Sequence, residues 1–82
     1  MIEIRVNKSA REKQVRDYLN NTIIMAQDVA DRGMNKFRMQ YPRNIGVGPL
    51  ELVTMVENET NGTVYGGYKC ITDGFITFNI RS

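Results

Sequence analysis

"TNGTVYGGYKCITDGFITFNI", residues 60–80, carries the strongest fold signals in this chain of 82 residues. Asn61-Gly62 and Asp73-Gly74 are dipeptides typical of two-residue hairpin turns, in which both turn positions need positive φ. The segments that follow them, residues 63–71 and 75–80, are rich in β-branched and aromatic residues, which favour strands. We therefore expect two antiparallel strands here, each entered through one of the turns.

The rest of the sheet is predicted from alternating and apolar segments further upstream. Residues 50–57, "LELVTMVE", are apolar on both faces of a strand and indicate a central strand that pairs with the segment 63–71. Residues 36–41 alternate between apolar and polar side chains and end at Pro42, which cannot donate to a strand ladder. Residues 2–6, "IEIRV", alternate in the same way and predict a half-buried strand.

One long helix is expected between the first two strands. Ser9 and Glu12 have the spacing of a capping box, and Gly33 suits the left-handed residue that ends a helix. A helix of about 23 residues would span roughly 35 Å. The resulting order is β-α-β-β-β-β, an α+β single domain over residues 1–82, with a mainly antiparallel sheet and the helix packed on one face. The predicted apolar face of the helix holds Val15, Tyr18, Leu19, Thr22, Ile23, Met25, Ala26, Val29 and Ala30.

Ile24 points to the polar side of this helix, about 180° from Val15. A single exposed isoleucine is ordinary on a protein surface. The alternative is a subunit contact in which Ile24 is flanked by Asn20, Asn21 and Asp28. A domain this small has a limited core of its own, and association is one common remedy. We therefore expect a homo-oligomer with these four residues at the interface.

The composition argues against several kinds of chemistry. Cys70 is the only cysteine and histidine is absent, so an intrachain disulfide and the Cys/His zinc sites are excluded. The commonest general base at neutral pH is missing as well. We expect no enzyme activity, no cofactor and no metal. The sequence shows neither a secretory signal nor an apolar run long enough for a membrane span, which predicts a cytoplasmic protein.

The stretch "QYPRNIGVGPLE", residues 40–51, raises the question of a binding site. It closes a segment that has no acidic residue between Asp31 and Glu51 but several cations, so it is suited to attract an anion. Its glycines match neither a P-loop nor a dinucleotide-binding fingerprint. Two interpretations remain open, namely a plain turn and an anion pocket stiffened by its two prolines. The cations are Arg32, Lys36, Arg38 and Arg43.

The pocket interpretation assigns a role to each polar or aromatic group of the loop. Tyr41 offers a ring for stacking, Arg43 offers a fork for phosphate or carboxylate, and Asn44 offers donors and an acceptor. Gly66-Gly67 indicates a bulge, a sharp bend or a close backbone approach, and together with Tyr65 and Tyr68 it would make a second wall. The full set of expected ligand-binding residues is Arg38, Tyr41, Arg43, Asn44, Gly46, Gly48, Tyr65 and Tyr68.

Two stretches carry a resemblance to a known family. "LNNTIIMAQDV" at 19–29 and "YPRNIGVGPLELVT" at 41–54 resemble the anti-Thoeris sponge proteins of phages. The resemblance implies a phage-encoded oligomer that sequesters a cyclic-ADP-ribose-type immune signal, without degrading it, in pockets between subunits. The chain is shorter than that family leads one to expect, which puts part of the pocket in doubt.

Three functions follow from these observations. The first is a non-enzymatic, oligomeric binder that sequesters an anionic, nucleotide-type immune signal in the cytosol of a phage host. The second is an anti-CRISPR-like inhibitor that binds a host defence protein through Ile24 or a sheet edge. The third is a small RNA- or DNA-binding domain, because helix-on-sheet domains bind RNA with aromatic strands. Its cations would be Arg32, Lys36, Arg38 and Lys69.

Overall fold

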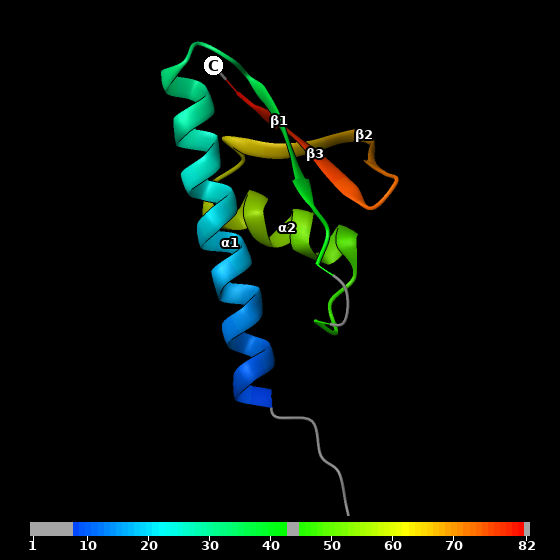
Figure 1. The fold of residues 1–82 in the computed structure, drawn as a ribbon. Helices are drawn as coiled ribbons and strands as arrows, with labels where there is room; N and C mark the ends of the chain where they lie inside the picture. Colours follow the sequence, from blue (N-terminus) through cyan, green and yellow to red (C-terminus); the bar gives the residue numbers. More distant parts are fainter. Residues whose placement is uncertain (1–7, 43–44, 82) are drawn as a thin grey trace, which may run out of the picture.

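The computed structural model describes residues 8–42 and 45–81, except for the side chains of Lys8 and Tyr68. Figure 1 shows a long helix beside a small twisted sheet, with a shorter helix below the sheet. The α+β class is confirmed, and the strand predicted at residues 2–6 lies outside the described residues. In chain order the elements are α1 (Lys8–Asp31), β1 (Lys36–Gln40), α2 (Pro49–Glu59), β2 (Val64–Thr72) and β3 (Phe75–Ile80).

The described sheet is antiparallel and has the strand order β1-β3-β2. The predicted β2–β3 hairpin is confirmed, since Asp73 (φ 51°) and Gly74 (φ 79°) both take positive φ between the paired residues Thr72 and Phe75. The third strand arrives from earlier in the chain, because β1 pairs with the far side of β3. The sequence predicted three consecutive strands, at residues 50–57, 63–71 and 75–80, joined by two hairpins. The first of these hairpins is wrong, because the third strand of the sheet is β1.

The strand predicted at residues 50–57 is instead the helix α2. Gly48 is its N-cap in an extended conformation, and Pro49 occupies the start of the helix, where its missing N–H costs nothing. The buried residues of α2 are Leu52, Val53 and Val56, which share one side at helical spacing. Leu50 is 67% exposed, although a strand would place it on the same face as Leu52.

Asn61-Gly62 ends this helix instead of joining two strands. Asn61 has φ 52° and Gly62 has φ 80°. The Asn61 N–H donates to the Asn58 carbonyl at 3.4 Å, and the Gly62 N–H donates to the Glu57 carbonyl at 2.8 Å. These are the two hydrogen bonds of a Schellman motif. The expected positive φ is therefore confirmed, but the turn follows a helix and not a strand.

The long helix α1 closely follows its predicted bounds. It includes Lys8, one residue before the expected start at Ser9. It ends before Gly33, which has φ 77° as predicted, and the Met34 N–H donates to the Val29 carbonyl at 3.0 Å. The apolar face is largely confirmed, with Tyr18, Leu19, Thr22, Ala26 and Val29 buried. Met25 and Ala30 are exposed, because the buried stripe is narrower than the predicted one.

Both helices contribute to one core on the same face of the sheet. α1 packs on β1, α2 packs on β2, and the two helices contact each other. The rings of Phe37 and Phe78 stack in this core with centroids 5.4 Å apart. The expected close approach at Gly66 is confirmed, because a Cβ atom there would lie 2.7 Å from Cγ1 of Val53. The expected bulge is confirmed as well, by the register shift between Gly66 and Ile71.

Tyr18 gives the fold a measurable pH dependence. Its hydroxyl is buried without a hydrogen-bond partner among the described residues, and this burial raises the pKa of the phenol to about 12. Thr22 opposes the rise in pKa but donates its own proton to the Tyr18 carbonyl oxygen at 2.8 Å. An unfolded tyrosine ionises near pH 10, so the folded state holds this proton over a range in which the unfolded state loses it.

The variant Tyr18→Phe tests this directly. The free energy of unfolding is independent of this group below about pH 10. It falls as the pH rises from about 10 towards about 12, because the unfolded state then loses the phenol proton before the folded state does. We expect the wild-type free energy of unfolding to fall over this range more steeply than that of Tyr18→Phe. At neutral pH the variant should be equally stable or slightly more stable, because it removes a buried, unpaired hydroxyl. Urea unfolding at several pH values measures both, and parallel pH profiles of the two proteins would contradict this account.

Candidate functional site

The loop after β1 uses its tyrosine to hold its own shape. The Tyr41 hydroxyl donates to the Val47 carbonyl at 2.6 Å, and the Tyr41 N–H donates to the Gly74 carbonyl at 2.7 Å. The ring is half-buried and packs against the core. Tyr41 therefore helps to close the loop, because its hydroxyl and its N–H both bond within the protein. Arg43 and Asn44 lie outside the described residues, so their expected roles stay predictions.

The two glycines of this loop have structural explanations. Gly46 has φ 74°, and a Cβ atom there would lie 2.8 Å from Nε of Arg11. Gly48 is the N-cap of α2, and Ile45 between β1 and α2 is buried. The described part of the loop is thus fitted to turning the chain from β1 into α2 against the start of α1.

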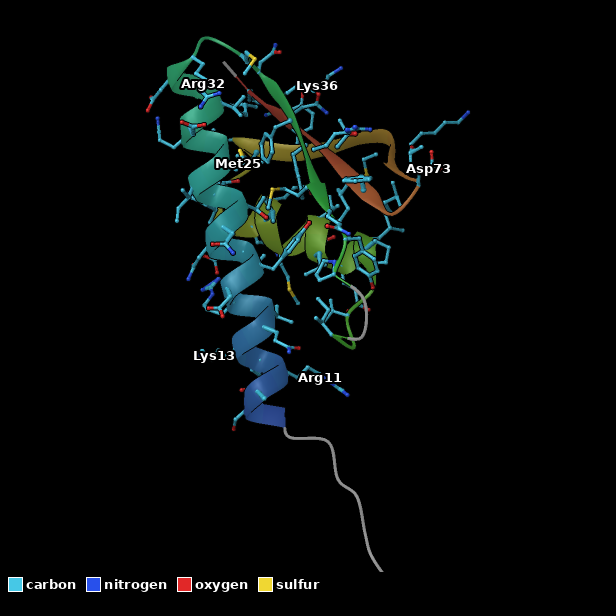
Figure 2. All side chains as sticks on the ribbon, viewed as in Figure 1. Arg11, Lys13, Met25, Arg32, Lys36 and Asp73 are labelled. Carbon is cyan, nitrogen blue, oxygen red and sulfur yellow. The ribbon has the colours of Figure 1, made fainter. Side chains whose placement is uncertain are left out.

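A second surface brings several of the predicted ligand residues together. Along β1 and β3 the buried side chains alternate with side chains that face away from the helices. No described helix covers this second side of the sheet (Figure 2). We call this side the open sheet face. Strand pairing places the side chains of this face in three rows across the strands. The rows are Lys36 with Asn79 and Tyr65, Arg38 with Thr77, and Gln40 with Phe75 and Thr72.

Two arginines lie over aromatic rings on the open sheet face. Cζ of Arg38 is 5.0 Å from the centroid of the Phe75 ring, and Cζ of Arg81 is 5.3 Å from the centroid of the Tyr65 ring. Each such cation–π contact contributes about 0.5–1 kcal/mol at an exposed site. The contacts hold two planar cations beside two rings on a surface that solvent reaches.

The acidic residues of the described helices and strands all lie on the helices, whereas cations lie on both helices and strands. β1, β2 and β3 contain no Asp or Glu, and Asp73 lies in the turn between β2 and β3. The acidic residues of α1 and α2 are Glu12, Asp17, Asp28, Asp31, Glu51, Glu57 and Glu59. The strands and the residue after β3 carry only cations, namely Lys36, Arg38, Lys69 and Arg81. This distribution favours an anionic partner on the sheet over one on the helices.

The open sheet face therefore holds part of the predicted ligand set. Arg38 and Tyr65 lie on it, and Gly67 faces the same side, since a Cβ atom there would lie 3.0 Å from Nδ2 of Asn79. Tyr68 is in β2, but its side chain lies outside the described residues. Sequence reasoning missed Phe75 and Arg81. The alternation of residues 75–80 was the available signal, because it places Phe75 out of phase with the buried Ile76 and Phe78.

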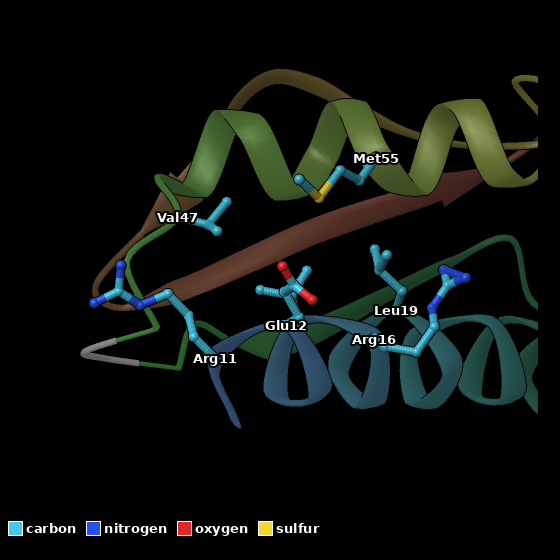
Figure 3. A pocket seen from close by; sticks show the side chains of 7 residues that line it. Arg11, Glu12, Arg16, Leu19, Val47 and Met55 are labelled. Carbon is cyan, nitrogen blue, oxygen red and sulfur yellow. The ribbon is translucent and has the colours of Figure 1, made fainter. Parts of the chain in front are cut away.

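A groove lies between α1 and α2 (Figure 3). It encloses about 430 Å³, a size that suits small ligands. Its floor is apolar and two arginines stand at its rim, but Arg16 pairs with Glu59 at 2.7 Å and Arg11 packs against Gly46. None of the described residues that were predicted to bind ligand lines it. The lining residues are Arg11, Glu12, Val15, Arg16, Leu19, Val47 and Met55.

The residues of α1 that we expect at a subunit contact are exposed to solvent, as such a contact requires. Ile24 is 66% exposed, and Asn20, Asn21 and Asp28 are exposed beside it. The Asp28 carboxylate pairs with Arg32 at 3.2 Å, so Arg32 belongs to the end of this helix. The predicted orientation of Ile24 is confirmed, while the interface itself stays a prediction.

Among residues 8–42 and 45–81, no group of three or more Cys, Asp or Glu side chains is arranged to hold a metal ion. Within the same part of the chain, no helix has the length and apolar character that crossing a membrane requires. Comparison of the chain with protein-family models, with curated proteins and with solved structures finds no match.

Proposed function

We propose that this protein is a non-enzymatic binder of nucleotide-type ligands and that the open sheet face is its binding surface. One observation carries the proposal. Arg38 with Phe75 and Arg81 with Tyr65 form two cation–aromatic pairs on one exposed face. The strands that build this face contain no acidic residue.

The chemistry of these pairs matches the parts of a nucleotide. A guanidinium forms paired hydrogen bonds to a phosphate, and the face of an aromatic ring or of a guanidinium stacks on a base. Asn79 and Gln40 lie in the same rows of the sheet, and their amides can donate to and accept from a base edge. Together these groups supply charge, stacking and polar recognition.

The proposed ligand class is the one expected from the sequence, but the proposed binding site is the open sheet face and not the loop at residues 40–51. The hydroxyl of Tyr41 is engaged with Val47, and the groove between the helices is mainly apolar with its Arg16 already paired. Among the described residues of these two places, no arginine lies over an aromatic ring as Arg38 and Arg81 do on the open sheet face. Sequestration of a nucleotide immune signal, in a phage-encoded anti-defence role, is the biological use that we propose on the resemblance of residues 19–29 and 41–54 alone.

A double variant tests the proposal. Arg38→Ala/Arg81→Ala removes both cations of the pairs, and Lys13→Ala is the control, because Lys13 is an exposed cation on α1, far from the sheet in Figure 2. The calorimetric ligand panel contains mononucleotides, cyclic ADP-ribose isomers, cyclic oligonucleotides and short single strands. We expect at least one ligand to bind, and the double variant to bind it at least about 10-fold more weakly, since hydrogen bonds to charged groups contribute about 1.5–3 kcal/mol each.

The outcomes of this titration are separable. The Lys13→Ala control should bind within about 2-fold of wild type, because an exposed charge far from the site is screened within about 10 Å. The proposal fails if no member of the panel binds. It also fails if the double variant, shown to be folded by circular dichroism, binds as tightly as wild type.

A further inference from the structure

We infer that the ligand of the open sheet face is a single strand of nucleic acid that spans both cation–aromatic pairs at once; this inference rests on the proposed function. Phe75 and Asn79 are four positions apart on β3, and Tyr65 lies opposite Asn79 on β2. At about 3.4 Å per residue, the two pairs are separated by roughly 14 Å along the strand direction.

This separation is too long for one base and its phosphate. At the stacked rise of about 3.4 Å per nucleotide, it corresponds to about four nucleotides, and to fewer if the strand is stretched. Each ring has a cation of its own, since Arg38 lies over Phe75 and Arg81 lies over Tyr65. A ligand that repeats base and phosphate along its length satisfies both pairs together, whereas a mononucleotide satisfies only one.

The space between the pairs also suits a strand. Thr77 lies between Phe75 and Asn79 on β3, in the row of Arg38, so the β3 position between the two pairs carries a small polar side chain. Gly67 adds no side chain beside the Asn79 amide. Along β3, the short Thr77 side chain leaves room for a sugar–phosphate backbone to pass from one pair to the other.

Single-stranded nucleic acid fits this face better than a duplex does. In a duplex the flat faces of the bases are already stacked on each other, and A-form RNA presents only groove edges and backbone to a protein. Exposed aromatic rings contribute to affinity through base stacking, which requires bases that are free to leave their neighbours. The aromatic half of each pair would therefore be unused by a duplex.

A length series tests the inference on the full chain. The probes are a fluorescently labelled mononucleotide, oligothymidylates and oligouridylates of about two, four and eight nucleotides, and a duplex of matched length. We expect a gain in affinity of at least about 10-fold between two and four nucleotides, because the second pair engages only then, and little further gain beyond that length. The single strand should bind at least about 10-fold more tightly than the duplex.

Two aromatic variants and one control define which surface is responsible. Phe75→Ala and Tyr65→Ala should each weaken binding of the longest single strand by about 5- to 100-fold, the range expected for one stacked base. Leu50→Ala removes an apolar side chain of α2 that is more exposed than Phe75 and should leave binding unchanged. With Lys36, Arg38 and Arg81 at phosphates, log K should fall with log salt concentration at a slope of about −2, or about −0.7 for each neutralised phosphate.

The possible results separate this inference from the proposed function. A mononucleotide that binds as tightly as the longest strand, and loses affinity in Arg38→Ala/Arg81→Ala, overturns the inference and leaves the proposed function standing. A duplex that binds as tightly as the single strand overturns the inference in the same way. If no probe and no small nucleotide binds, both fail.

Discussion

Phe78→Ala is expected to lower the free energy of unfolding by about 3–5 kcal/mol, the usual effect of truncating a buried aromatic residue to alanine. Phe78 is fully buried and stacks on Phe37 across the β1–β3 ladder. Its partner on the other side is Gly66, which has no side chain to fill the space that the substitution leaves. Small domains have total stabilities of about 5–15 kcal/mol, so much of the protein's stability should be lost.

Phe75→Ala is the matched control for this prediction. It changes the same residue type in the same strand, but the Phe75 side chain lies on the open sheet face and is 36% exposed. Its loss should cost about 1 kcal/mol or less, since it leaves no buried cavity. Urea unfolding of the two variants measures the difference. Equal losses of stability in Phe78→Ala and Phe75→Ala would contradict the assignment of the core to the helix-covered side of the sheet.

Leu52→Ala should destabilise the protein by about 2–5 kcal/mol, whereas Leu50→Ala should cost no more than about 0.5 kcal/mol. Leu52 is fully buried and Leu50 is 67% exposed, because residues two apart on a helix point about 200° apart. On a strand the two leucines would share a face, and the two substitutions would have similar effects. The pair therefore tests whether residues 50–57 are helix or strand.

Chemical denaturation of both leucine variants, with helix content followed by circular dichroism, makes this comparison. The account requires a cooperative transition in each protein, with a lower midpoint for Leu52→Ala alone. A Leu50→Ala variant that is as unstable as Leu52→Ala would show that the segment is a strand, as the sequence pattern first indicated.

The sequence predicted the elements whose signals are local, but it assigned the segment that forms α2 to a strand. Asp73-Gly74 and the alternation after it were enough to define the β2–β3 hairpin, and Gly33 was enough to end α1. The segment "LELVTMVE" at 50–57 is a short apolar run, which periodicity alone assigns to either a strand or a helix. Pro49 was the signal that favours a helix start. Asn61-Gly62 did not decide the matter, because positive φ serves a hairpin and a Schellman motif equally well.

The candidate site was predictable only in part, for a different physical reason. Arg38 and Tyr65 stood out in the sequence as a cation and a ring. Their position on one surface depends on β1 pairing with β3 and on β3 pairing with β2, and such long-range pairings leave no local trace. Arg81 was missed for the same reason, since it becomes notable only beside Tyr65 from another strand. Phe75 was missed although the alternation of residues 75–80 places it out of phase with the buried Ile76 and Phe78.

This topology connects the fold to the proposed activity. The strand order β1-β3-β2 brings cations from residues 36 and 38 beside rings from residues 65 and 75. The two helices and their carboxylates lie on the opposite side, so they stabilise the sheet without adding negative charge to its open face. Because the core lies on one side of the sheet, the cationic and aromatic side chains of the open sheet face are not needed to fill the core.

The most direct test is a chemical-shift titration of the isotopically labelled protein with an unlabelled single strand of about eight nucleotides. The account predicts that the largest amide shifts fall on the open sheet face, at Arg38, Tyr65, Phe75, Thr77 and Arg81, and that α1 and α2 change little. Shifts concentrated along the groove between α1 and α2, around Leu19 and Met55, with the sheet amides unchanged, would contradict it.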